Sequence, residues 1–159
     1  MIFKEIEEKI KRLGLKIASK DFTRPWGGFF VISESETLKF VNHFFEGIDK
    51  GLIEKGGRLS PKILIVNPNS RLSWQYHLRR SEVWQVIRGR AGVVRSDSDV
   101  QKQMKVFNEG DKLTLRQGER HRLIGLEEHC VIAEIWQHTD IAHPSDENDI
   151  IRVQDDFGR

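Results

Sequence analysis

The amino-acid sequence predicts an all-β domain whose antiparallel strands form a sandwich or barrel, with a single helix at the N-terminus. From about residue 28 onward, apolar residues fall into nine short runs with β-like spacing, and glycine, asparagine, aspartate or proline separates the runs. The segments between these runs are too short for the crossover helix that a parallel sheet requires. A chain of 159 residues fits one domain, so we expect a single domain over residues 1–159.

Residues 1–14 have the pattern of an amphipathic helix. Apolar residues recur at helical spacing among lysines and glutamates, namely Ile2, Phe3, Ile6, Ile10 and Leu13. Gly14 follows as a helix stop. We expect the apolar stripe to pack on the barrel or on a second subunit.

The remaining chain divides into a barrel over residues 28–137 and a tail over residues 138–159. The expected strands are residues 28–35, 37–45, 62–68, 83–89, 91–97, 103–110, 111–118, 121–126 and 130–137. Before them, residues 21–30 contain one proline and two glycines, which predict irregular backbone. The tail is acidic, and its pattern fits either a frayed terminus or an ordered flap.

Composition narrows the function classes and the compartment. The 26 lysines and arginines and the 24 aspartates and glutamates are interspersed and leave a net charge of +2, so we expect no nucleic-acid partner. Cys130 is the single cysteine and lies beside an apolar run, which predicts a buried free thiol in a reducing cytosol. The N-terminus has acidic residues and no uninterrupted apolar segment, so we expect a soluble cytoplasmic protein without membrane association.

Four polar residues in the barrel have the spacing of a metal site. Gln75 and His77 are two residues apart and so share one face of a strand, and Glu82 enters from the next strand. His121 follows in a second strand, turn, strand unit. Two imidazoles, a carboxylate and an amide oxygen suit one divalent ion such as zinc, which we place first, or iron, manganese, nickel or cobalt. The alternative is that both histidines are ordinary buried side chains satisfied by hydrogen bonds.

These two stretches resemble the two motifs of the cupin family. Gln75 stands where the first motif has its leading histidine, Asn69 where it opens on glycine, and Arg116 where the second motif has proline. The Gln-x-His variant is similar to the cupin domain of type II phosphomannose isomerases, which are mannose-6-phosphate isomerases. The same domain forms the C-terminal part of bifunctional mannose-1-phosphate guanylyltransferases.

The closer resemblance covers most of the chain in five pieces. They are RPWG (residues 24–27), the run with Lys62, Val66 and Pro68, RLSWQYHLRRSEVW (residues 71–84), HRL (residues 121–123) and ENDIIRVQDDFGR (residues 147–159). The departures from the family pattern, which bear on substrate identity, are a longer loop before the tail, Leu78, Arg79, Gly125 and Trp136. No G-x-G-T-R-L signature occurs, so we expect no guanylyltransferase activity.

The resemblance implies a cupin-type jelly roll that interconverts mannose 6-phosphate and fructose 6-phosphate through an enediolate. Such a reaction needs a base near C1 and C2 and an electrophile beside the oxygens, and a divalent ion with an open position suits the second role. Glu134 is the candidate base, because strand alternation turns it inward if Ala133 and Ile135 face outward. The alternative for Glu134 is a place on a solvated strand face.

A phosphosugar also needs cationic and aromatic contacts. Arg80 and Arg152 are the first candidates to bind the phosphate, and Lys62 is a further candidate. We also expect Arg152 to act with Glu134 in catalysis. If the tail folds over the barrel mouth as a lid, it brings Arg152 and Arg159 to the substrate. Trp26 is the candidate to stack on the sugar ring, whereas Trp84 is expected to pack in the core.

Other readings of the same residues remain open. The chain is a metal-dependent sugar-phosphate isomerase, or a non-catalytic metal cupin that binds a sugar or sugar phosphate. A third class comprises iron dioxygenases and nucleotide-sugar epimerases; Gln75 argues against the first and the full ligand set against the second. Because exposed strand edges favour pairing between subunits, we expect a homodimer.

Overall fold

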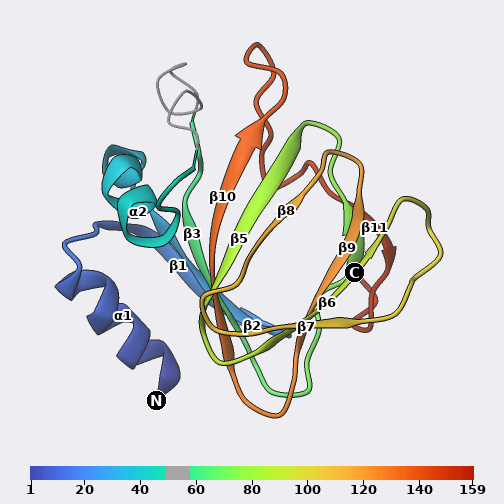
Figure 1. Ribbon diagram of the computed structural model, residues 1–159, viewed down its shortest axis with the longest axis horizontal. Coiled ribbons are helices and arrows are strands. Elements are labelled where there is room, and N and C mark those ends of the chain that lie inside the picture. Colours follow the sequence, from blue (N-terminus) through green and yellow to red (C-terminus); the bar gives the residue numbers. More distant parts are fainter. Residues whose placement is uncertain (49–57) are drawn as a thin grey trace.

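The computed structural model describes residues 1–48 and 58–159 and contains two antiparallel sheets packed face to face (Figure 1). The six-stranded sheet has the order β1-β2-β3-β10-β5-β8, and the five-stranded sheet has the order β11-β4-β9-β6-β7. The strand bounds are β1 Ile17–Arg24, β2 Gly27–Ile32, β3 Lys62–Val66, β4 Trp74–Tyr76, β5 Arg80–Arg88, β6 Ala91–Ser96, β7 Lys105–Phe107, β8 Lys112–Leu115, β9 Arg120–Gly125, β10 Cys130–His138 and β11 Ile151–Gln154. Among the described residues no strand pairing joins the two sheets, so the barrel is open at its edges.

Two apolar layers lie on opposite faces of the six-stranded sheet. On β10, Val131, Ala133 and Ile135 pack in the cluster that contains the helices, whereas Cys130 and Ile132 pack between the two sheets. Strand β3 divides its side chains in the same way and is buried along its whole length. Burial on both faces explains why these strands read as continuous apolar runs rather than alternating ones.

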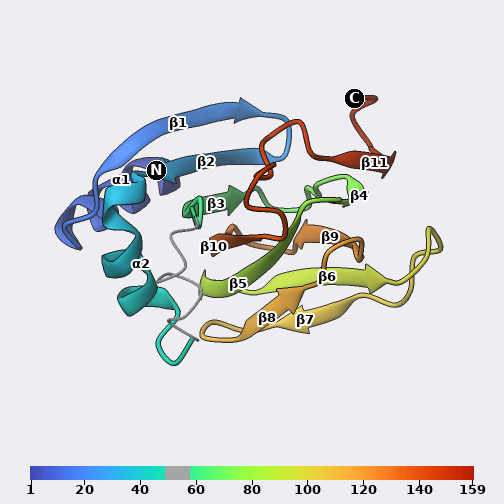
Figure 2. The ribbon, with the colours of Figure 1, turned by 90° about the horizontal axis from the view of Figure 1, so that it is seen from above.

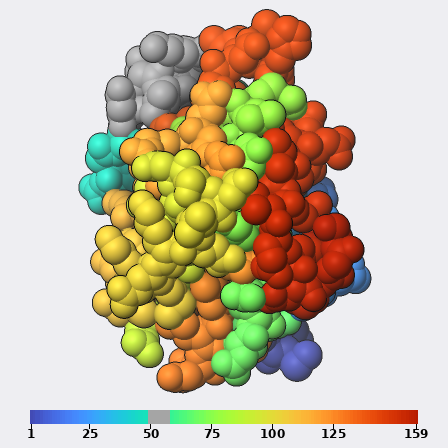
Figure 3. Space-filling model, turned by 90° about the vertical axis from the view of Figure 1, so that its right-hand side faces the viewer, coloured from blue at the N-terminus to red at the C-terminus, as the bar shows by residue number. Residues whose placement is uncertain are grey.

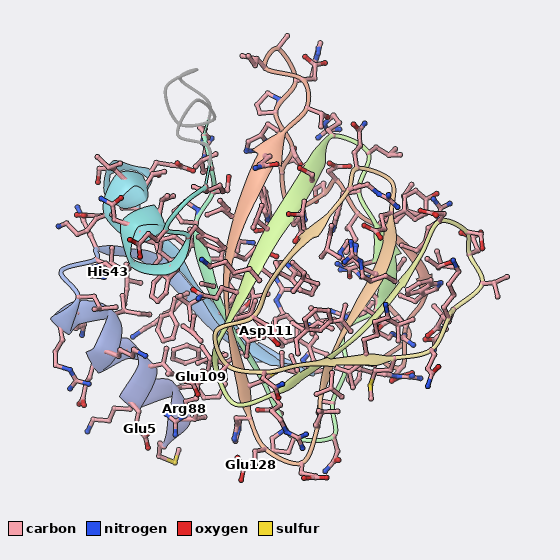
Figure 4. The ribbon with its side chains drawn as sticks, in the orientation of Figure 1. Glu5, His43, Arg88, Glu109, Asp111 and Glu128 are labelled. Atoms are coloured by element: carbon pink, nitrogen blue, oxygen red, sulfur yellow. The ribbon has the colours of Figure 1, made fainter. Side chains whose placement is uncertain are left out.

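The predicted N-terminal helix is confirmed as α1, Ile2–Arg12. Its buried residues are Ile6 and Ile10, and they pack in the same cluster as the outer face of the six-stranded sheet. Arg88 at the end of β5 donates a hydrogen bond of 2.9 Å to Glu5, which ties the helix to the sheet (Figure 4). Among the described residues no helix is long and apolar enough to cross a membrane.

The strand expected over residues 37–45 is wrong. This segment is helix α2, Thr37–Phe44, preceded by the short 3-10 helix η1, Glu34–Glu36. Its aromatic and β-branched composition favours a strand, but the buried positions include Phe40, Val41 and Phe44, which have helical spacing. Figure 2 shows that α2 stands with α1 at one side of the strands.

The irregular backbone expected over residues 21–30 is limited to a register shift between Asp21 and Arg24 and a turn at Pro25 and Trp26, and the rest of the segment is regular strand. Strands β1 and β2 form an antiparallel hairpin in which Arg24 pairs with Gly27, so the proline of this segment lies in a tight turn. At the other end of the chain, β11 pairs with β4, and Arg152 lies opposite Gln75. The sheets therefore extend beyond residues 28–137 in both directions. Figure 3 shows the C-terminal segment, in red, lying against the green residues around β4.

Candidate metal centre

Three potential ligands converge between the two sheets. His77 follows β4, Glu82 lies on β5 and His121 lies on β9. Their nearest ligand atoms all lie within 4.8 Å of one another, and all three side chains are buried. Glu82 Oε1 is 2.7 Å from His77 Nε2 and 3.7 Å from His121 Nε2. The predicted convergence of these three residues on one point is present in the fold.

Both imidazoles are oriented with Nε2 toward the centre of this cluster. His77 Nδ1 lies 2.7 Å from the backbone carbonyl of Asp149, and His121 Nδ1 lies 3.0 Å from that of Glu119. A carbonyl can only accept, so each Nδ1 carries a proton and donates it, and each Nε2 is left facing the centre, where an ion would bind it. Metal-binding histidines in proteins are held in this way.

His121 has the protonation state that a metal ligand requires. Burial lowers the pKa of His121 to about 4, against the opposing effect of Glu82, so the ring is neutral near pH 7. Within the described part of the chain, its buried Nε2 atom has no hydrogen-bond partner. A buried polar atom without a partner is costly unless a ligand satisfies it, so the residues present fit a divalent ion.

Gln75 lies beside this cluster as the sequence predicts. It pairs with His121 across β4 and β9, which places both side chains on one face. Its Oε1 atom accepts a hydrogen bond of 2.6 Å from Ser73, while Nε2 lies 3.5 Å from His77 Nε2. As a metal ligand, the amide would turn over so that Oε1 faces the histidines and Nε2 faces Ser73.

Glu134 faces the same interior, since its neighbours Ala133 and Ile135 point to the helical layer. Its two carboxylate oxygens accept hydrogen bonds from the indole nitrogens of Trp84 (2.9 Å) and Trp136 (3.0 Å). Burial raises the pKa of Glu134 well above its usual value, and the neighbouring carboxylate of Glu82 adds to this. Trp84 packs in the core, as predicted, and also orients the carboxylate.

The pKa of Glu82 is shifted in the opposite direction from that of Glu134. Burial by itself would raise the pKa of Glu82, but His77, the hydrogen bond with Glu134 and the charge of Arg80 outweigh burial and lower it well below the usual value. Of the two neighbouring carboxyl groups, Glu82 therefore has the lowered pKa and Glu134 the raised pKa. An ionised Glu82 has the form that a metal ligand needs.

A cavity of about 470 Å³ opens beside the metal cluster. Its lining contains all the substrate and catalytic candidates predicted from the sequence, namely Trp26, Lys62, Arg80, Glu134, Arg152 and Arg159. Gln75 and Glu82 also line it, so the ligands and the candidates face one space. The cavity further contains Arg24 and Glu147, which sequence reasoning did not select. Arg24 stands in the RPWG segment that carried part of the resemblance.

The tail contacts the candidate ligand His77 directly, which sequence reasoning did not anticipate. Besides the carbonyl of Asp149 that holds His77, its carboxylate accepts hydrogen bonds from the backbone N–H groups of Leu78 (2.9 Å) and Arg79 (3.0 Å). The hydroxyl of Ser145 donates to the same carboxylate at 2.6 Å. The tail is therefore an ordered part of the site and not a frayed end.

A comparison with known families identifies the domain. The family described as "Mannose-6-phosphate isomerase C-terminal" matches residues 43–155. The chain belongs to this family. Xanthan biosynthesis protein XanB of Xanthomonas campestris pv. campestris (strain B100) is 27% identical over 163 residues, which cover 98% of this chain and 28% of XanB. The chain therefore spans less than a third of the length of that relative.

Solved structures share the fold of this chain. Oxalate decarboxylase from Bacillus subtilis superposes with a TM-score of 0.60 at 16% identity, covering 84% of this chain and 29% of that one. The capsular polysaccharide assembling protein CapF from Staphylococcus aureus gives a TM-score of 0.56 at 12% identity, covering 88% of this chain and 34% of that one. The predicted cupin-type jelly roll is confirmed.

Proposed function

We propose that this domain is a metal-dependent aldose-ketose isomerase that interconverts mannose 6-phosphate and fructose 6-phosphate. The observation that carries the proposal is the placement of Glu134, a carboxylate that is not among the ligand candidates, on the wall of the cavity that Glu82 and Gln75 also line. The family match and the XanB relative support a sugar-phosphate substrate. The proposed cofactor is one divalent ion, with zinc placed first among the transition metals.

Each residue has a defined role in this proposal. Gln75, His77, Glu82 and His121 would hold the ion, which supplies positive charge beside the sugar oxygens that become negative in the enediolate. Glu134 moves the proton between C1 and C2, and the indole N–H groups of Trp84 and Trp136 fix its direction. A raised pKa suits this role. A group that both accepts and returns a proton works best when its pKa lies near the pH of the reaction.

The remaining pocket residues bind and orient the sugar phosphate. Arg80 lies with its guanidinium carbon 3.6 Å from the centre of the Trp136 ring, and its Nε is 3.4 Å from Glu82 Oε1, so it places a fixed positive charge next to the ligands. Trp26 offers an apolar wall for the sugar ring. Lys62 is buried close to the same cavity and adds a second cation.

The proposal is tested with purified protein loaded separately with zinc, manganese, cobalt, nickel or iron(II). Fructose 6-phosphate is added and the aldose product is detected with a coupling enzyme. We expect turnover with at least one ion, its loss on chelation, and its loss in His121→Ala. Absence of turnover with every ion, while fructose 6-phosphate still raises the melting temperature, would instead identify a non-catalytic sugar-phosphate binder.

A further inference from the structure

Three arginines, one from near the N-terminus and two from the C-terminal tail, line the cavity. Arg24 ends strand β1, Arg152 lies on β11 and Arg159 is the last residue of the chain. Figure 2 shows the arrowhead end of β1 and strand β11 on the same side of the molecule. The fold therefore brings Arg24 to the same cavity as Arg152 and Arg159, which lie more than a hundred residues further along the chain.

The charges of these arginines are incompletely balanced. In the part of the chain that the structure describes, the Arg152 guanidinium has no hydrogen bond and no ion pair. Arg24 Nε is 3.1 Å from a carboxylate oxygen of Asp21 but is not aligned for a hydrogen bond, and this buried nitrogen has no other partner among those residues. Arg159 pairs through two nitrogens with Asp155. Donors remain available toward the cavity.

The other two cations of the cavity are already engaged by the tail. Arg80 donates to the hydroxyl of Ser145 (2.9 Å) and to the carbonyl of Asp146 (3.0 Å). The ammonium group of Lys62 pairs with Glu147. Although both were predicted to face a phosphate, a ligand would have to displace these partners to reach their full set of donors.

The three arginines carry like charges that repel one another. Burial lowers the pKa of Arg152, and the positive charges of Arg159 and Arg24 lower it further. The repulsion is relieved by a compact anion, and planar guanidinium groups match the oxygens of a phosphoryl group in pairs. A dianion would gain more from this arrangement than a carboxylate of single charge.

The turn after Arg24 cannot easily move away from the cavity. Gly27 has φ = 148°, and any Cβ at this position would overlap the backbone carbonyl of Ile65 on the neighbouring strand. The hairpin therefore packs directly on β3, which fixes the end of β1 and places Arg24 and Trp26 on the cavity wall.

We propose that Arg24, Arg152 and Arg159 form the subsite for the phosphoryl group of a sugar phosphate monoester. The inference rests on the proposed function, because it assigns one end of the same ligand whose reacting end lies at the metal centre. It differs from the expectation drawn from sequence in replacing Arg80 and Lys62 by Arg24 and Arg159 as the partners of Arg152.

The test compares Arg24→Gln, Arg152→Gln and Arg152→Lys with the unchanged protein and with the control Arg90→Gln, which alters an exposed arginine outside the cavity. Binding of fructose 6-phosphate, inorganic phosphate and unphosphorylated fructose is measured by calorimetry on metal-loaded protein. Because each arginine contributes charge-assisted hydrogen bonds, we expect both glutamine variants to bind the two phosphate ligands about 10- to 100-fold more weakly. Fructose binding is expected to be unchanged, and Arg152→Lys to restore part of the loss.

Two results would overturn the subsite. One is that both glutamine variants bind fructose 6-phosphate within about twofold of the unchanged protein. The other is an equal loss for fructose and fructose 6-phosphate in variants whose circular dichroism and melting temperature are unchanged. If phosphate binding depends on the arginines but no ion gives turnover, the subsite stands and the isomerase proposal fails.

Discussion

At the scale of single residues, Glu134 is the side chain beside the candidate metal centre whose surroundings bear most directly on proton transfer. It is a buried carboxyl group that receives two indole N–H donors and lies beside a second carboxyl group, Glu82. Indole donors can be supplied only by tryptophan, so Trp84 and Trp136 give this carboxylate a fixed direction without adding charge. A proton-transfer group needs this combination of fixed position and raised pKa.

Replacing Glu134 by glutamine keeps the shape of the side chain and removes its capacity to accept a proton. We expect kcat for fructose 6-phosphate to fall by about 10²- to 10⁴-fold with the metal content unchanged. The control is Glu128→Gln, an exposed glutamate that lies far from the centre (Figure 4). Full activity of Glu134→Gln in the steady-state assay would show that another group moves the proton.

Cys130 is the second residue with a clear expectation. It is fully buried on the inner face of β10, and burial raises the pKa of its thiol to about 12. Because the thiolate is the reactive form, we expect the native protein to remain unmodified by a disulfide reagent at about pH 8. One equivalent should react once guanidinium chloride unfolds the chain. Rapid stoichiometric reaction of the native protein would contradict the buried position.

The candidate metal ligands could be selected from sequence because each is a side chain in a spaced pattern, and the structure brings His77, Glu82 and His121 together. Gln75, His77, Glu82 and His121 are visible as residue types, and the motif resemblance singled them out. The partner that orients His77 is the backbone carbonyl of Asp149. Every residue has a backbone carbonyl, so the sequence cannot single this one out. The indole donors to Glu134 were equally hidden, because a tryptophan in a strand reads first as core.

At the scale of secondary-structure elements, the C-terminal segment is the part whose role depends most on the fold. Strand β11 adds to the edge of the five-stranded sheet, and the residues before it contact the candidate ligand His77 and Arg80. The buried Arg122 on β9 donates hydrogen bonds to the backbone carbonyl and the side chain of Gln154. These bonds hold the end of β11 against the sheet. Arg71 and Asp156 form a two-bond ion pair just beyond β11.

Loss of the Asp149 carboxylate should loosen this segment and, with it, His77. We expect Asp149→Ala to weaken binding of zinc by about 10- to 100-fold, as for other residues that orient metal-binding histidines. Affinity is measured by competition with a chromogenic chelator. Asp140→Ala, at an exposed position of the same segment, is the matched control. Equal zinc affinity in both variants would mean that the tail does not position the ligand.

Elements differ in how well their sequence predicts them. Helix α1 was predicted because its apolar positions and its stop are local features. Helix α2 was taken for a strand because its aromatic and β-branched residues outweighed their helical spacing. The pairing of β11 with β4 joins residues about 75 positions apart and follows no local pattern, so it was available only from the fold.

At the scale of the whole molecule, the open edges of the two sheets bear on the oligomeric state. Strands β1 and β8 end one sheet, and β11 and β7 end the other. Unpaired edges present backbone groups that favour association, so we expect a homodimer with about twice the 18.5 kDa mass of the chain. Light scattering coupled to size-exclusion chromatography gives the mass. A monomer at every protein concentration tested would contradict this expectation.

The candidate metal ligands come from both sheets. Glu82 belongs to the six-stranded sheet, whereas Gln75 and His121 belong to the five-stranded sheet. An ion at the centre would thus be a cross-link between the two layers, and its binding free energy would add to the cohesion of the whole domain. The close-packed core between the layers resists any change in their separation. An ion held there would have to fit a separation between the sheets that the core fixes, so the fold would limit its ionic radius as well as the ligand atoms.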